Sequence, residues 1–121
     1  MVKIKTADLI GVQLDLAVAK ADGLPLCNEA MQGDFIMVGF GDGDLEIFSP
    51  STDWSHGGPI IERERIETRP SNDAPEWGAR ITDADSWSEG WKFGPTPLIA
   101  AMRAFVASKL GDEVEVPEVT P

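Results

Sequence analysis

The strongest local signal in the chain lies near its end, in GPTPLIAAMRAFVASKLGDE, residues 94–113. Thr96 is a favourable N-cap, Pro97 suits the first helical position, and Gly111 is a typical C-terminal stop. The apolar side chains between these signals recur at helical spacing, and they are Leu98, Ala101, Met102, Phe105, Val106 and Leu110. The pattern predicts an amphipathic helix, and the rest of the chain has to supply the surface that covers its apolar face.

The remaining patterns predict one more helix and several strands. Apolar spacing followed by Gly23 predicts a helix at about residues 10–22. Alternating or continuous apolar runs predict strands at 35–40, 45–48, 60–69 and 77–82, with 2–6 as a short strand or an extended arm. A tight turn is expected at 41–44, and irregular backbone at 24–33 and 83–94.

These elements indicate one α+β domain over residues 1–121, a small antiparallel sheet with two packed helices. Residues 112–121 alternate acids and valines before two prolines, which predicts either an edge strand or a flexible acidic tail. Trp77 is expected in the core. Trp87 and Trp91 stand among polar residues, where they could cover the sheet, line a pocket or form a protein-binding hot spot.

The acidic composition limits the partners. There are 21 acids against 10 bases, a net charge of −11, which repels phosphate backbones and predicts no direct nucleic-acid binding. The same charge favours a basic partner, or serves only to keep a small domain soluble. No stretch approaches ~18 apolar residues, so no membrane segment is expected. Cys27 as the single cysteine favours a reducing cytoplasm, and the composition leaves open a homo-oligomer.

The chemically richest segment is STDWSHGGPIIERER, residues 51–65. Asp53 and His56 lie beside two serines, but such closely spaced residues seldom reach the geometry of a hydrolytic triad. A turn is the simpler interpretation, because Ser and Asp side chains bond to nearby backbone N–H groups and Gly57-Gly58 permits unusual dihedral angles.

The other interpretation of this segment is a binding loop. Trp54 offers a flat apolar surface and Arg63 a cation, and the start of the closing helix offers unpaired N–H groups to an anion. The candidate ligand-binding residues are Ser51, Thr52, Asp53, Trp54, Gly57, Gly58, Arg63, Gly94 and Thr96. An alternative is a small hydrolase that uses Asp53, His56 or Glu62 as acid or base.

Metal ligands are scarce. One cysteine and one histidine fall short of a zinc site, and Asp42 and Asp44 lack the other oxygens of a calcium loop. We therefore predict no metal and no cofactor.

Three long segments resemble the NinX-like family of phage proteins: STDWSHGGPIIERERI, GPTPLIAAMRAFVASKLGDEVEVP and the opening KTADLIGVQLDLAVAKADG. The resemblance implies a small soluble accessory protein of a phage or prophage, acting in the bacterial host cytoplasm, and it brings no catalytic residues. Together with the residues above, it predicts a non-enzymatic binding module for a host protein or a small anionic, nucleotide-like ligand. An acidic decoy that occupies a basic host protein surface is the other alternative.

Overall fold

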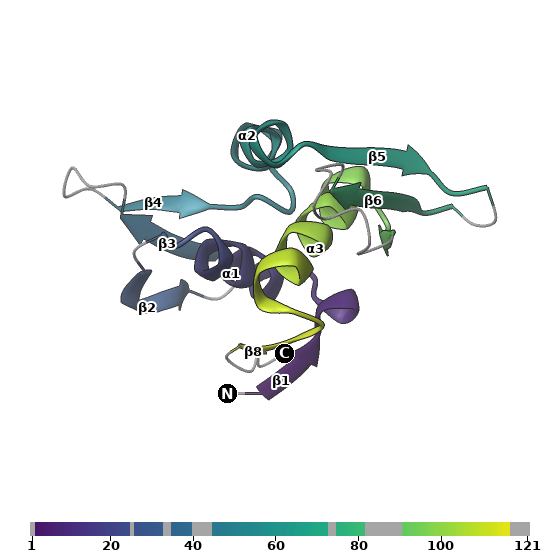
Figure 1. The fold of residues 1–121 in the computed structure, drawn as a ribbon. Helices are drawn as coiled ribbons and strands as arrows, with labels where there is room; N and C mark the ends of the chain where they lie inside the picture. The colour runs from purple at the N-terminus through teal and green to yellow at the C-terminus, as the bar shows by residue number, and fades with distance from the viewer. Residues whose placement is uncertain are drawn as a thin grey trace.

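The computed structural model describes residues 2–24, 26–32, 35–39, 45–72, 75–81 and 91–116, which form three α-helices and three antiparallel sheets (Figure 1). The helices are α1 (Gly11–Ala21), α2 (Trp54–Glu64) and α3 (Pro97–Leu110), with a short 3-10 turn, η1, at Thr6–Asp8. The first sheet pairs β1 (Val2–Lys5) with β8 (Glu113–Val116). The second contains β2 (Leu26–Gln32), β3 (Phe35–Gly39) and β4 (Leu45–Phe48). The third contains β5 (Ile66–Pro70), β6 (Trp77–Ile81) and β7 (Lys92–Gly94). The α+β class predicted from the sequence is confirmed.

Helix α3 lies at the centre, with α1 and the second sheet on one side and the third sheet on the other (Figure 1). Its ends match the sequence signals, since the Thr96 hydroxyl oxygen accepts the Ile99 N–H at 3.0 Å and Gly111 adopts a φ of 90°. Its burial exceeds the predicted stripe, because neighbours cover several sides. The buried residues are Leu98, Ile99, Ala100, Ala101, Met102, Ala104, Phe105, Val106 and Ala107.

The two ends of the chain form the first sheet. Val2 pairs with Val116 and Ile4 with Val114 on its inner face, while Lys3 pairs with Glu115 on its outer face. Of the two alternatives predicted for the start of the chain, residues 2–5 form a strand and not an extended arm, and residues 113–116 form its partner strand. The rest of the predicted tail, 117–121, lies outside the described residues.

Two segments predicted as irregular contain strands. Residues 26–32 form β2, which pairs with β3 across a register shift, and residues 92–94 form β7 at the edge of the third sheet. Neither segment has a strong strand pattern, so the backbone hydrogen bonds of a neighbouring strand decide these cases. The turn predicted at 41–44 and the tryptophan at position 87 lie outside the described residues. Trp77 is half-buried and packs against the core.

The largest error concerns the segment before the third sheet. The sequence predicts a turn followed by a strand at 60–69, but residues 54–64 form α2 and the strand begins only at Ile66. Gly57 allows close packing rather than a turn. A Cβ added to Gly57 would lie 2.5 Å from both Leu98 Cδ1 and the Pro50 carbonyl oxygen, so only glycine fits this crossing with α3. The segment contains two glycines and Pro59, which are poor helix formers, so the contact with α3 stabilises the helix.

Candidate functional site

The polar residues at the start of α2 hold the backbone in place. Asp53 is the N-cap, and its Oδ1 accepts the Ser55 N–H at 2.9 Å and the Ser55 hydroxyl at 2.6 Å. These hydrogen bonds hold the pKa of the Asp53 carboxyl below its usual value. The predicted bonding of Asp to a nearby N–H is therefore present, in the form of a helix cap instead of a turn.

His56 is also engaged with the backbone. Its Nδ1 accepts the Ser49 N–H at 3.0 Å, so in the neutral ring the proton is assigned to Nε2. The ring stacks on Phe48, with centroids 5.6 Å apart, and Nδ1 lies 4.0 Å from Asp53 Oδ2. An Asp–His pair of the triad type needs an imidazole N–H that faces the carboxylate. Here that nitrogen is an acceptor, and the Ser55 hydroxyl is bonded to Asp53.

Ser51 anchors the segment to α1. Its backbone N–H donates to Asp15 Oδ1 at 2.8 Å, and both residues are buried. Burial raises the pKa of the Asp15 carboxyl. Hydrogen bonding from Ser51 and the electrostatic effect of the nearby His56 lower this pKa, but they offset only part of the effect of burial. The Ser51 Oγ is buried and meets no partner with good hydrogen-bond geometry in the described part of the chain. This candidate residue therefore faces the interior.

The candidate residues Gly57 and Gly94 both lie against the first turn of α3, and both contacts are closely packed. Gly57 presses on Leu98, and a Cβ added to Gly94 would lie 2.9 Å from the Ala100 nitrogen. Thr96 caps its own helix. Gly58 is half-buried, with nothing within 4 Å of an added Cβ. Gly57 and Gly94 therefore serve close packing, and Thr96 serves as a helix cap.

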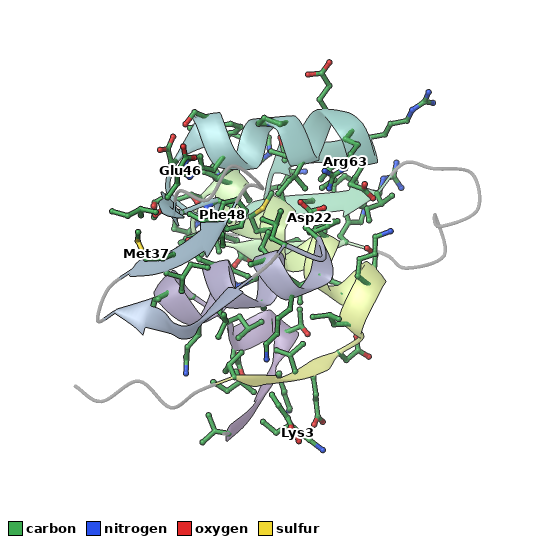
Figure 2. The ribbon with its side chains drawn as sticks, turned by 90° about the vertical axis from the view of Figure 1, so that its left-hand side faces the viewer. Lys3, Asp22, Met37, Glu46, Phe48 and Arg63 are labelled. Atoms are coloured by element: carbon green, nitrogen blue, oxygen red, sulfur yellow. The ribbon has the colours of Figure 1, made fainter. Side chains whose placement is uncertain are left out.

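Trp54 and Arg63 stand at opposite ends of α2, about 13 Å apart along the axis at ~1.5 Å per residue. Trp54 is 55% exposed. Arg63 donates to Asp22 Oδ1 at 2.7 Å and to Glu64 Oε2 at 2.9 Å, and these contacts raise its pKa. Figure 2 shows Arg63 beside Asp22 near one end of the helix. The two side chains therefore cannot hold one small ligand between them. Of the other candidates, Thr52 is exposed, as is the proposed acid–base residue Glu62.

A second arrangement of an indole and guanidinium groups lies on the third sheet. None of its residues was predicted from the sequence as a ligand-binding residue. The guanidinium carbons of Arg80 and Arg69 lie 4.6 Å and 5.2 Å from the Trp91 ring centroid. Glu67 joins the two arginines, at 2.8 Å from Arg69 and 2.9 Å from Arg80. These bonds hold the pKa of the Glu67 carboxyl below its usual value.

A hollow of about 250 Å³ opens beside this cluster. It is lined by Arg69, Pro70, Ser71, Asn72, Gly78, Trp91 and Phe93, which we call the β5–β7 groove. Strand pairing brings its walls together, because Gly78 on β6 is the partner of Arg69 on β5 and of Phe93 on β7. The sequence gives one hint, the suggestion that Trp91 lines a pocket. It does not reveal that Arg69 and Arg80 lie beside it.

Among the residues that the structure describes, no three His, Cys, Asp or Glu side chains gather closely enough to hold a metal ion. No helix formed by these described residues has the length and apolar character needed to cross a bilayer.

Comparison with known proteins gives one finding. A protein-family model described as Bacteriophage P22, NinX matches residues 5–109, which is most of the chain. None of the curated proteins matches the chain.

Proposed function

The chain belongs to the family of bacteriophage P22 NinX and is a phage accessory protein, and on that premise we propose that it is a non-enzymatic module that binds a host protein in the bacterial cytoplasm. The proposed contact is the start of α2, centred on Trp54. The observation that carries the proposal is a 55% exposed indole on a helix start whose neighbouring polar groups are already bonded within the chain.

The engaged polar groups favour binding over catalysis. A nucleophilic serine needs a base to accept its proton, but the Ser55 hydroxyl donates to the cap residue Asp53. A base needs a free ring nitrogen directed at the nucleophile, but His56 Nδ1 accepts a backbone N–H. A hydrolase that uses Ser55 as nucleophile and His56 Nδ1 as base would require both hydrogen bonds to be broken.

The position of Trp54 favours a protein partner over a small ligand at this place. A small ligand needs a concave site with convergent polar groups, and Arg63 lies at the far end of the same helix, bonded to acids. Exposed tryptophans are frequent hot spots of protein interfaces, where the partner supplies the pocket. The net charge of −11 favours a partner with a basic rim around that pocket.

The test is capture from a lysate of the bacterial host with the tagged full chain, at low and at high salt. We expect a host protein that the wild type retains and Trp54→Ala loses. Ile10→Ala is the matched control, because Ile10 is a comparably exposed apolar residue, at 52%, outside α2. Equal capture by wild type and Trp54→Ala would contradict the proposal. Capture that is lost at high salt but is equal for wild type and Trp54→Ala at low salt would favour the acidic decoy instead.

A further inference from the structure

We propose a second binding site in the β5–β7 groove, for a small ligand that combines a planar ring with a phosphate, such as a nucleoside monophosphate. None of the groove residues belongs to α2, so this inference goes beyond the proposed protein contact. It rests on the shape of the groove, on its aromatic walls and on its local charge.

The shape comes from the glycine in the middle strand. A Cβ added to Gly78 would lie 3.2 Å from Trp91 Cε3 and 3.2 Å from Phe93 Cε1, so both rings approach the backbone there. Phe93 remains 46% exposed, which leaves part of its apolar surface to a ligand. A hollow of about 250 Å³ suits one ring and its substituent, and it is smaller than a typical drug-sized pocket of roughly 300–1,000 Å³.

The charge is local and opposite in sign to that of the whole chain. Arg69 and Arg80 with Glu67 form a trio whose formal charge is positive, on a protein with a net charge of −11. The Arg69 side chain is 61% exposed, and its guanidinium has five N–H groups, more than its hydrogen bond to Glu67 uses, so an anion from solvent can reach it. Guanidinium groups pair well with phosphate because they donate two parallel hydrogen bonds.

The trio is also held in place before a ligand arrives. Glu67 accepts from Arg80 and Arg69 at the same time, which fixes both guanidinium groups relative to the sheet. Both guanidinium groups lie over the Trp91 ring. A ligand therefore meets an ordered cation beside an aromatic wall, and it loses less conformational entropy on binding.

Simpler ligands satisfy only part of this arrangement. A nucleoside stacks on an aromatic ring but offers no charge to Arg69, and inorganic phosphate offers charge but no ring. A long nucleic acid adds phosphates that the acidic remainder of the chain repels. A single ring with a single phosphate uses both features of the groove.

The experiment is calorimetric titration of the full chain at low ionic strength with adenosine, guanosine, cytidine and uridine monophosphates, the matching nucleosides and inorganic phosphate. We expect at least one monophosphate to bind, with an affinity roughly tenfold or more above its nucleoside and above phosphate alone. Trp91→Ala and Arg69→Gln should each weaken that binding roughly tenfold, which is the scale of one stacked base or one charged contact.

Two sets of variants separate a site from a folding effect. Trp91→Phe keeps a flat ring and should retain most of the affinity, and Arg69→Gln changes a side chain that is 61% exposed, so thermal unfolding should show a folded protein. Trp54→Ala and Arg63→Gln remove the same residue types on α2 and should bind as the wild type does. Absence of binding by all four monophosphates at millimolar concentration would overturn the proposal. So would wild-type affinity in Trp91→Ala and Arg69→Gln, or phosphate alone binding as tightly.

Discussion

Helix α2 and the β5–β7 groove each carry an exposed aromatic side chain and arginine, yet they are built in opposite ways. At α2 the polar residues are neighbours in sequence and bond to one another, as Asp53 does with Ser55. In the groove the residues come from three strands, and cross-strand pairing brings them together. A segment rich in reactive residue types can thus use its polar groups in hydrogen bonds within the segment, which leaves them unavailable to a ligand. A hollow forms where distant segments meet.

The arginines show the same contrast. Arg63 donates to Asp22 and Glu64 at the end of α2, where an exposed ion pair contributes about 0–1 kcal/mol. Arg69 and Arg80 lie over an indole ring, with one acid between them. The charge of Arg63 is already neutralised by two acids, whereas the trio on the third sheet retains a positive charge.

The largest expected effect tests whether Gly57 fills a packing role that its neighbour Gly58 lacks. Gly57→Ala places a Cβ 2.5 Å from the Pro50 carbonyl oxygen, a backbone atom that cannot move away easily, and should destabilise the fold by about 2 kcal/mol. Gly58→Ala meets nothing within 4 Å and should stabilise the helix by about 0.5–1 kcal/mol. Urea unfolding of both variants measures the two signs. Equal effects would mean that the glycines serve the same purpose.

A smaller effect separates the two tryptophans, exposed Trp54 and half-buried Trp91, by stability alone. Trp91→Ala removes two guanidinium–ring contacts, each contributing roughly 0.5–1 kcal/mol, and should lower the free energy of unfolding by about 1–2 kcal/mol. Trp54→Ala removes a side chain that is 55% exposed and should change stability by less than about 0.5 kcal/mol. Thermal unfolding monitored by circular dichroism compares them. A large loss in Trp54→Ala would show that this indole packs against the fold and is not available to a partner.

Asp15, which accepts the Ser51 N–H, should make the stability of the fold depend on pH with a sign opposite to that of most acids, whose pKa is lowered in the folded state. Because burial raises its pKa in the folded protein, the folded state holds this proton to higher pH than the unfolded state does. Stability should therefore fall as pH rises from near 3.8 through the raised pKa. Asp15→Asn keeps an oxygen that accepts the Ser51 N–H and should remove this fall. If the stability of the wild type changed with pH at the same slope as that of Asp15→Asn, the raised pKa of the buried Asp15 carboxyl would be contradicted.

The smallest effect concerns the cap of α2. The folded-state pKa of Asp53 is lowered, so its stabilisation is present above the unfolded value near 3.8 and is lost as pH falls through the lower, folded value. Asp53→Ser keeps a capping oxygen without the charge, and should retain most of the stability while it loses this acid-side dependence. Melting temperatures of wild type, Asp53→Ser and Asp53→Ala between acidic and neutral pH test this. An identical acid-side slope in all three would show that Asp53 has no part in it.

Local signals were sufficient for elements with clear ends and a regular apolar pattern. Thr96, Pro97 and Gly111 bound α3 as predicted, and α1 lies within the predicted helix. The alternation of Ile and Val with charged residues indicated strands at the positions of β1 and β8, but it left open an extended arm at the first and a flexible tail at the second. For the two helices the residues that determine the element lie inside it or beside it, so the sequence is sufficient.

The sequence failed where a distant partner decides the conformation. Gly57-Gly58-Pro59 is a poor helix segment, and it is helical because Gly57 fits against Leu98 while Ile60 is buried. The short strands β2 and β7 likewise depend on neighbours for their hydrogen bonds.

The sequence by itself determined the family, the α+β class, the central helix and the acidic character of this protein. Only the tertiary structure decided that the side chains of Asp53 and His56 accept backbone N–H groups and that Ser51 is buried against Asp15. It also decided that Arg69, Arg80 and Trp91 meet on one sheet. The physical reason is range. Caps and periodic apolar faces act over a few residues, whereas close packing, burial and the alignment of side chains across strands depend on atoms from segments far apart in the chain.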